Sequence, residues 1–304
     1  MEFGAAVWPF QWPAPYDDAI RRIAAQGFKQ IELIAWNQDV LQEAYTPEDI
    51  RRLRHLLREE GLGLSEFVFT PRGVADADPM RRRAGIEQFQ RAVEVAHELG
   101  TGIINSVVAT PFDLPFPGLL SLPQTQELIV DVPEGLDWAG GYDTYVASLQ
   151  ACCAACEQAG LRYALETHPY RWATTAMSLM RLIEHVGSSA LGVNLDPSHM
   201  FPCGELPHVA VYQLGPRVFH THFSDNDGVT NAHWRPGKGK IDWAALLAAL
   251  RDVGYDGVIS IELEDVPGRA SASRPVAGEA FDHENRESRN YLSGIANRLG
   301  ITLS

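Results

Sequence analysis

The stretch "SLMRLIEHVGSSALGVNLD", residues 178–196, contains the pattern that decides the fold of this chain. Apolar residues recur at i, i+3 and i+4 in its first half, at Leu179, Leu182, Ile183 and Val186. That spacing places them on one face of a helix, and Gly187 is typical of a helix C-terminus. The apolar run 191–195 is short and continuous, which predicts a strand buried on both faces. Strands of this kind belong to a parallel sheet covered by helices.

The same order of amphipathic helix, glycine-containing turn and short apolar strand recurs along the chain. Six further segments show it: 16–34, 48–69, 89–108, 145–166, 208–222 and 243–262. With an opening strand at 2–8 the chain has eight strands, and the tail from about 275 to 299 supplies the last helix. Eight strand–helix units predict an α/β protein, a single (β/α)8 TIM barrel over residues 1–304. The rival, a doubly wound open sheet, usually has a glycine-rich phosphate loop after its first strand, and "VWPFQWP" is no such loop.

Two connections are longer than the others, at about 109–141 and 223–240. Long loops in a compact domain are usually functional, and in a barrel both would lie on the face at the carboxyl ends of the strands. No segment rich in proline and serine divides the chain, so we expect one domain.

Composition argues against several classes of function. The formal net charge of −14 disfavours a nucleic-acid partner, because binding to phosphates requires basic residues. The N-terminus has no signal-peptide pattern, and no stretch approaches the ~18 apolar residues of a membrane span. We therefore expect a cytoplasmic protein without a membrane partner, and a homo-oligomer is possible.

The cysteines predict no redox chemistry. Cys152, Cys153 and Cys156 fall inside an expected helix, which predicts buried, inert thiols rather than a redox pair.

Four consecutive strands end in a residue that can bind a metal: Glu166, Asp196, His222 and Glu262. In a barrel these strand ends are neighbours on one rim, so the four side chains can converge. Three carboxylates brought close together need a counter-charge, and a divalent cation supplies it. Because the set is rich in oxygen, we expect one divalent ion per chain, Mn²⁺ first, with Mg²⁺, Co²⁺ or Zn²⁺ as alternatives.

Each of the four also has an ordinary structural explanation. Glu166 could cap a helix or pair with an arginine, and Asp196 could form an Asx turn before Pro197. His222 could be a core histidine and Glu262 a surface residue. Their common position at four successive strand ends favours the metal site over these separate explanations.

Three residues near these strand ends are candidates for supporting roles. His199 lies three residues after Asp196, where we expect it to be too displaced to share the metal but able to hydrogen-bond a substrate hydroxyl. His220 is on the same face of its strand as His222 and one layer deeper, so we expect a core or supporting position. Asp225 could orient an imidazole.

The C-terminal half of the chain resembles the xylose isomerase-like TIM barrels, the sugar phosphate isomerase/epimerase family. The resemblance is carried by "ALETHPYRWATT" (164–175), "LGVNLDPSHMF" (191–201), "VFHTHFSDND" (218–227), "RPGKGKIDW" (235–243) and "GYDGVISIELED" (254–265). These stretches are similar to the family patterns E-x-H, D-x-x-H, H-x-H-x-K-D, P-G-x-G-x-I-D-W and a final strand that ends in glutamate. The resemblance implies that the four strand-end residues bind one divalent metal, that Glu166 and Glu262 transfer protons at carbon, and that His199 contacts substrate.

The chain departs from the family's ketose 3-epimerases at two substrate positions. Trp172 stands where they carry a glutamate, and Gly228 stands where they carry an arginine. Ser224 replaces the usual lysine before the aspartate, and Lys238 replaces a frequent glutamate. The related apurinic endonucleases hold three zinc ions, and Asn231 occupies a position where they need aspartate. These departures weaken the assignment to a free-ketose 3-epimerase and to a nuclease.

Together these features predict a metal-dependent sugar isomerase or epimerase that removes a proton next to the carbonyl of a keto sugar. The metal would act as a Lewis acid on the enediolate, and Glu166 or Glu262 would take the proton. The alternative is a lyase or dehydratase acting on 3-keto glycosides or inososes. A non-catalytic sugar-binding barrel and an apurinic endonuclease rank lower. The expected partner is a small-molecule carbohydrate, and its candidate contacts besides His199 are Trp8, His168, Trp172, His233 and Arg235.

Overall fold

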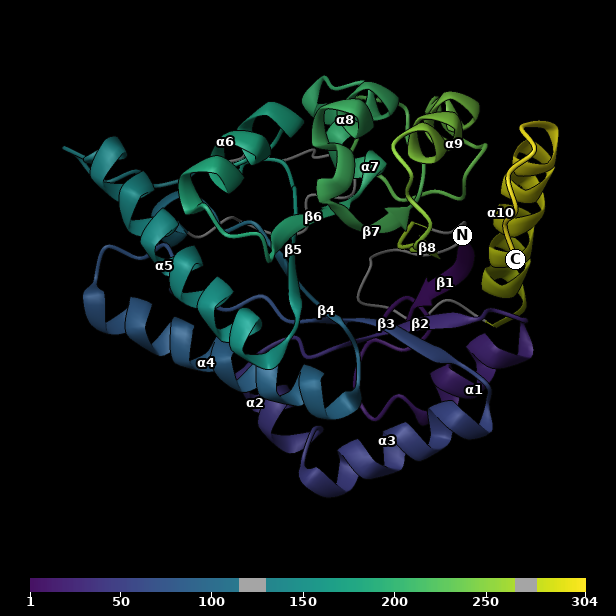
Figure 1. Ribbon diagram of the computed structural model, residues 1–304, viewed down its shortest axis with the longest axis horizontal. Helices are drawn as coiled ribbons and strands as arrows, with labels where there is room; N and C mark the ends of the chain where they lie inside the picture. Colours follow the sequence, from purple (N-terminus) through teal and green to yellow (C-terminus); the bar gives the residue numbers. More distant parts are fainter. Residues whose placement is uncertain (115–129, 266–277) are drawn as a thin grey trace.

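The computed structural model describes residues 1–114, 130–265 and 278–304 of the chain. Eight parallel strands close into a barrel in sequence order, and β1 pairs with β8 to complete the ring. Figure 1 shows the strands at the centre and the helices outside them. The predicted (β/α)8 TIM barrel is confirmed, and the open doubly wound sheet is excluded.

The strands are short, and each falls within a segment that the sequence predicts as a strand. They are β1 (Glu2–Ala6), β2 (Gln30–Ile34), β3 (Gly63–Val68), β4 (Ile103–Val107), β5 (Arg162–Glu166), β6 (Leu191–Leu195), β7 (Val218–Phe223) and β8 (Val258–Ile261).

Helices lie between consecutive strands, and α10 follows the last strand. They are α1 (Asp17–Ala25), α2 (Gln38–Glu43), α3 (Pro47–Glu59), α4 (Pro79–Leu99), α5 (Trp138–Ala159), α6 (Ala176–Val186), α7 (Pro197–Met200), α8 (Pro207–Leu214), α9 (Trp243–Asp252) and α10 (Gly278–Arg298). Three short 3-10 helices are η1 (Pro111–Asp113), η2 (Phe201–Cys203) and η3 (Gly215–Arg217). Helix α6 illustrates the sequence signals: Thr175 and Ser178 form a capping box at its start, and Gly187 ends it with a φ of 75°, which glycine adopts readily.

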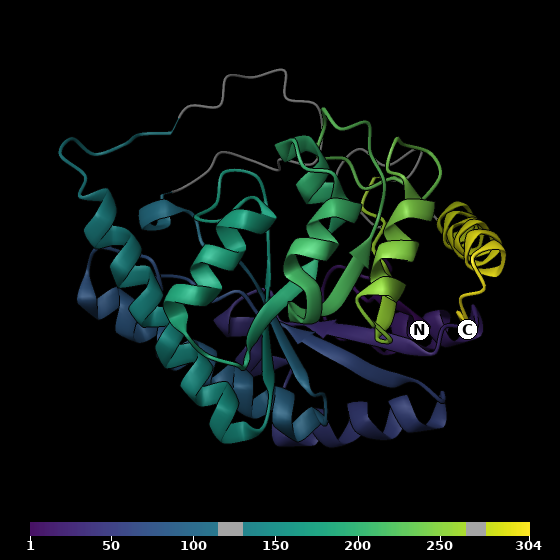
Figure 2. The same cartoon turned by 45° about the horizontal axis from the view of Figure 1, so that its top comes forward.

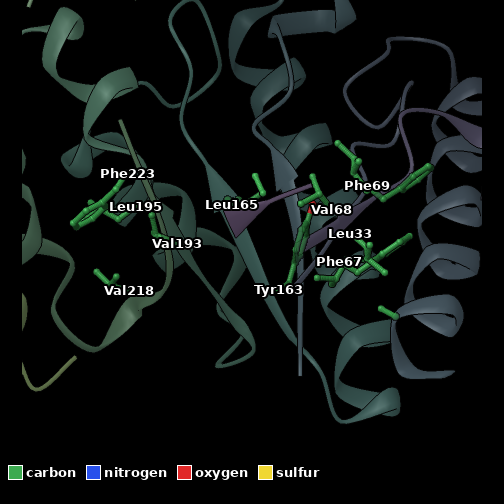
Figure 3. Packing of buried hydrophobic residues seen from close by; sticks show 14 of the residues in the cluster. Leu33, Phe67, Val68, Phe69, Tyr163, Leu165, Val193, Leu195, Val218 and Phe223 are labelled. Carbon is green, nitrogen blue, oxygen red and sulfur yellow. The ribbon is translucent and has the colours of Figure 1, made fainter. Parts of the chain in front are cut away.

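Alternation along the strands separates an apolar outer face from a polar inner face. Tyr163 of β5 packs against Phe89 of α4, with ring centroids 4.6 Å apart. Because successive side chains point to opposite faces of a strand, Glu166 on the same strand points into the barrel. Phe223 of β7 likewise packs on an aromatic ring of α9, which turns His222 inward. Figure 3 shows Tyr163 and Phe223 among the buried apolar side chains.

The two ends of the chain meet at the first strand. The Phe3 backbone N donates a hydrogen bond of 2.7 Å to the Ser304 carbonyl oxygen, so the C-terminal residues run beside β1. Figure 2 shows the two ends close together. In this arrangement α10, the expected closing helix, covers the join between the first and last parts of the barrel.

Further expectations from the sequence concern the long connections, the cysteines and membrane spans. The connection at 109–141 begins with η1, and residues 115–129 of it lie outside the described residues. In the connection at 223–240, Asp225 and Trp234 form an antiparallel bridge. Cys152, Cys153 and Cys156 are buried, free thiols inside α5, as predicted. In the described part of the chain, no helix is both long and apolar enough to cross a membrane.

Candidate metal centre

The four predicted metal ligands meet on the inner rim of the barrel. Glu166 is the last residue of β5, and His222 is the penultimate residue of β7. Asp196 and Glu262 directly follow β6 and β8. Each offers one ligand atom, the four atoms lie within 4.8 Å of one another, and all four side chains are buried. The structure therefore brings together the residues that the sequence groups.

The local sequence around Asp196 explains how its carboxylate is aimed. Asp196 is the N-cap of α7, and its Oδ1 accepts hydrogen bonds from the Ser198 backbone N (2.7 Å) and Oγ (2.5 Å). Pro197 follows in the first turn, where a missing N–H costs nothing. Oδ2 is buried without a hydrogen-bond partner in the described residues. One oxygen thus serves the turn, and the other is left for a ligand.

In Glu166 and Glu262, a neutral donor holds one oxygen and the other oxygen faces His222. Oε2 of Glu166 accepts a hydrogen bond from Asn105 Nδ2 at 3.3 Å. Oε1 of Glu262 accepts one from Trp8 Nε1 at 2.9 Å. The other oxygen of each glutamate lies 3.1 Å from His222 Nδ1. Two carboxylates from different strands therefore face one imidazole nitrogen, and Trp8 contacts the site through one of them.

The electrostatics of the centre favour added positive charge. Burial, against the opposing effect of His233, raises the pKa of Asp196 to about 7, and Glu262 and Glu166 add to the rise. Burial alone would lower the pKa of His222, but the surrounding carboxylates outweigh it and hold that pKa well above its usual range. A divalent cation fits this set, because it would neutralise the carboxylates and bind one oxygen of each together with His222 Nδ1. The oxygen-rich donors suit a hard or borderline ion such as Mn²⁺ or Mg²⁺.

Two carboxylates that the strand-end pattern does not predict lie deeper in the barrel. Glu32 of β2 and Glu66 of β3 are partners in register and have no exposed surface. Nε2 of His222 is 2.7 Å from Glu32 Oε2 and 3.2 Å from Glu66 Oε1. His220 is buried beside them, with its Nδ1 3.5 Å from Glu66 Oε2, in the deeper layer that the sequence predicts for it. The signal that could have found both glutamates is a single carboxylate in each apolar strand, "QIELI" and "GLSEFV".

Three predicted substrate contacts, His168, His199 and His233, form a group beside the centre. The rings of His168 and His199 stack with centroids 3.6 Å apart, and His233 Nε2 lies 3.3 Å from His199 Nε2. His199 Nδ1 is 2.9 Å from the Asn231 side-chain oxygen, which accepts a hydrogen bond from Nδ1–H. His199 Nε2 is only 3.5 Å from Asp196 Oδ2. His199 is therefore closer to the predicted ligands than the sequence spacing suggests.

The two inner histidines of this group have opposite charge preferences. Burial lowers the pKa of His199 well below its usual range, and His168 and His233 lower it further. Burial also acts to lower the pKa of His233, but Asp265 and Asp196 outweigh it and raise that pKa to about 10. Near neutral pH, His233 is thus a cation and His199 a neutral acceptor. The pair can hold a proton next to the predicted ligands.

A cavity of about 980 Å³ opens onto the centre. Its volume is at the upper end of the roughly 300–1,000 Å³ typical of small-molecule sites. Its wall combines Glu262 and the three histidines with residues of other loops, among them Trp36, Arg72, Asp113 and Arg171. The cavity is therefore large enough for a small-molecule ligand.

Trp172 and Arg235, two further predicted substrate contacts, have partners among other side chains of the chain. Trp172 packs in an aromatic group, with its ring centroid 4.5 Å from that of Trp138. Arg235 Nε lies 3.3 Å from Glu284 Oε2 on α10, so an ion pair holds it there. Neither residue is among the described residues that line the cavity. Trp172 packs on an aromatic side chain, and Arg235 pairs with an acidic one.

Asp225 also contacts groups other than the predicted imidazole. Its Oδ2 accepts hydrogen bonds of 2.9 Å from the Gly237 backbone N and from Trp243 Nε1. Its Oδ1 accepts one of 3.2 Å from the Ile241 backbone N. The carboxylate therefore fastens the loop after β7 to the start of α9, which helps to place His233.

The family model described as the xylose isomerase-like TIM barrel matches residues 20–284, and the chain belongs to that family. It is 22% identical over 260 residues to D-psicose 3-epimerase from Agrobacterium fabrum, covering 84% of this chain and 81% of that protein. It is 24% identical over 276 residues to 3-dehydroshikimate dehydratase from Pseudomonas putida, covering 87% of this chain and 38% of that longer protein. Its relatives therefore include enzymes, among them sugar epimerases and a dehydratase.

Solved structures show the same fold at low sequence identity. D-psicose 3-epimerase from Clostridium cellulolyticum H10, with D-tagatose, matches with a TM-score of 0.76 at 20% identity, covering 97% of this chain and 99% of that chain. The 3-keto-D-glucoside 4-epimerase from E. coli matches with a TM-score of 0.72 at 20% identity over the same shares. These likenesses establish the barrel for this chain.

Proposed function

We propose that this protein is a divalent-metal-dependent epimerase or isomerase that acts on a keto sugar. The observation that carries the proposal is the pair of glutamates at the centre. Glu166 and Glu262 each present one oxygen 3.1 Å from His222 Nδ1, while a neutral donor holds the other oxygen. A carboxylate held in this way beside a reacting carbon can act as the general base or acid in proton transfer.

The proposed cofactor is one divalent ion per chain, Mn²⁺ first, held by Glu166, Asp196, His222 and Glu262. When bound, it would polarise the substrate carbonyl as a Lewis acid and so make the neighbouring C–H more acidic. Glu166 and Glu262 then take and return the proton. Proton return on the opposite face of the carbon gives epimerisation, and return at the adjacent carbon gives isomerisation.

His168 and His199 are placed to orient the substrate next to one of these bases. Glu166 Oε1 lies 3.7 Å from His168 Nε2 and 3.7 Å from His199 Nε2. A sugar hydroxyl between the imidazoles and the carboxylate would fix the position of the neighbouring carbon. Neutral His199 would accept a hydrogen bond from the hydroxyl at Nε2, the atom that faces His233 Nε2 at 3.3 Å when no substrate is bound.

A metal-dependent lyase or dehydratase is the second candidate. His233 is a cation whose Nε2 lies 3.8 Å from Asp196 Oδ2, so a general acid stands close to the centre. Such an acid would protonate a leaving hydroxyl or aglycone after the same proton abstraction. The similarity to a 3-dehydroshikimate dehydratase agrees with this alternative.

Incubation of the Mn²⁺-loaded protein with keto sugars in D₂O tests both candidates. We expect deuterium to enter the carbon next to the carbonyl, because both reactions begin with removal of that proton. An epimerase or isomerase returns a sugar of unchanged composition, whereas a lyase releases water or an aglycone, and mass spectrometry with NMR separates these products. A metal-free sample is the control. Absence of exchange across free, glycosidic and carboxylated keto sugars would refute the proposal.

Arg171 is placed to set substrate preference on the outer wall of the cavity. Its Nε is buried without a hydrogen-bond partner in the described residues. Burial lowers the pKa of the guanidinium, although Tyr145 and Asp113 oppose the shift. A hydroxyl or carboxylate of the substrate would supply the missing partner.

We expect Arg171→Gln to raise KM by about 10–100-fold, because a hydrogen bond to a charged group contributes roughly 1.5–3 kcal/mol. We expect kcat to change far less, since this contact is remote from the reacting carbon. Steady-state kinetics on the substrate found by the exchange experiment measures both. Arg181→Gln is the control, because this arginine of α6 places its guanidinium over the Tyr142 ring of α5. A fall in kcat with KM unchanged would contradict the assignment.

A further inference from the structure

The imidazole of His222 is held between two pairs of carboxylates. Nδ1 lies 3.1 Å from Glu166 Oε1 and 3.1 Å from Glu262 Oε2, at the proposed metal position. On the other side of the ring, Nε2 lies 2.7 Å from Glu32 Oε2 and 3.2 Å from Glu66 Oε1. The imidazole and all four carboxylates are buried. Nδ1 is therefore on the side of the proposed metal, and Nε2 is on the side of the deeper carboxylates.

We infer that Glu32 is a positioning residue that accepts the Nε2 proton of His222 and thereby keeps Nδ1 free as the ligand atom. A neutral imidazole carries one N–H, and only the other nitrogen can bind a metal. A carboxylate at hydrogen-bond distance decides which nitrogen carries the proton and holds the plane of the ring. It also makes the opposite nitrogen a stronger electron-pair donor to a metal. The inference rests on the proposed metal dependence of the site.

Glu32 is itself held in place by the barrel. A shift in the register between β2 and β3 falls at Ile31 and Glu32, and such irregularities aim side chains next to active sites. Glu66, its partner across the ladder, accepts a hydrogen bond of 3.0 Å from Asn105 Nδ2, which also donates to Glu166. Contacts between strands thus connect the deeper carboxylates to the proposed metal ligands.

A second cation is the rival explanation for these deeper groups. Glu32, Glu66, His220 and His222 could together hold an ion, because their ligand atoms also lie within 4.8 Å of one another. In that case His222 Nε2 would bind metal instead of donating a proton to Glu32. The two explanations differ in the number of ions bound and in the position of the imidazole proton.

Glu32→Gln tests the inference because it removes the charge at nearly constant volume. Titration of Mn²⁺ into metal-free protein, followed by calorimetry, should give one ion per chain for the wild type. The variant should bind with a Kd higher by about 10–100-fold, the usual effect of removing a partner of a metal-bound histidine. Glu284→Gln is the matched control: it removes another buried carboxylate, which pairs with Lys238 Nζ at 2.6 Å and is not in the proposed ligand set. Its Kd should match the wild type, and circular dichroism should show that both variants are folded.

The position of the proton can be measured in the unaltered protein, whether or not the variant folds. In ¹⁵N-histidine-labelled protein loaded with Zn²⁺, long-range ¹H–¹⁵N spectra should show His222 with Nε2 protonated, and His222→Asn identifies its signals. A proton on Nδ1, or a second ion with Nε2 unprotonated, would overturn the inference. A wild-type Kd for Glu32→Gln would also overturn it. If the wild type bound no divalent ion, the proposed function itself would fail, which is a different result from these.

Discussion

Replacing Asp196 with alanine should remove the metal and the activity together. The carboxylate contributes one free, buried oxygen to the set of four ligand atoms, and alanine leaves three ligands. We expect the loss of metal affinity to exceed the roughly 10–100-fold that follows removal of a residue that only supports a ligand. Elemental analysis of metal per chain, measured beside turnover, checks this result.

Asp196 also caps α7, so a second variant must separate the two roles. Asparagine can keep the cap, because its side-chain oxygen can still accept the hydrogen bond from the Ser198 backbone N. Asp196→Asn should therefore fold like the wild type and still bind metal poorly, since the charge is gone. Wild-type metal content in Asp196→Asn would show that the cap, and not the ligand charge, explains the alanine variant.

His199→Ala is the contrasting change at the same strand end. We expect it to retain metal, and the loss of one hydrogen bond to a polarised oxygen should lower the rate by about 10²–10³, or roughly 2–4 kcal/mol. His199 Nε2 lies 3.5 Å from Asp196 Oδ2, so both side chains are close enough to the proposed metal to be candidates for ligands. The two variants therefore decide which of the two residues binds the metal. If His199→Ala lost its metal while Asp196→Ala kept it, the two assignments would be reversed.

The fold was predictable because each strand–helix unit repeats one local pattern. In 178–196, the helical spacing, Gly187 and the apolar run each have a local cause, and the structure places α6 and β6 in that order. Closure of the ring is not local, but eight such units leave few other arrangements. The ligands at strand ends follow from closure, since parallel strands in a barrel place their carboxyl ends on one rim. Residues 30, 26 and 40 positions apart in the chain thereby become neighbours.

The deeper layer was not predictable in the same way. In "QIELI" a glutamate between apolar residues could point to either side of the strand, and the side is decided by register with β3. The expected depth of His220 followed from the face that it shares with His222. Glu32 and Glu66 have no such reference residue in their own strands. Only the closed barrel shows that they meet the ring of a histidine that follows them by more than 150 residues.

Loop side chains were the hardest to place. Trp172 lies only six residues after Glu166, yet it packs with Trp138 across the long connection. Arg235 lies in a family-like stretch, but Glu284 of α10 holds its guanidinium. In both cases the partner comes from a distant part of the chain, and no spacing in the sequence reports it. The position of a strand residue follows from the geometry of the barrel. The position of a loop residue depends on contacts with residues that are distant in the sequence.

Replacing either central glutamate with glutamine should stop interconversion of the two epimers. Each variant should still exchange deuterium into one of them. Glu166→Gln and Glu262→Gln each remove one base but keep an oxygen that can bind metal. Loss of a positioned base typically lowers the rate by about 10²–10⁴. The family resemblance implies that the two carboxylates serve opposite faces of the substrate carbon, and they reach His222 Nδ1 from β5 and from the residue after β8.

This arrangement predicts a specific result in D₂O at saturating Mn²⁺. Each epimer loses its proton to the base on its own face, so Glu166→Gln should still exchange deuterium into one epimer and fail with the other. Glu262→Gln should show the reverse preference, and neither variant should interconvert the two sugars. NMR of each pure epimer with each variant measures the four rates. If one variant lost exchange with both epimers while the other kept both, a single glutamate would act as the base, and the second would serve only as a ligand.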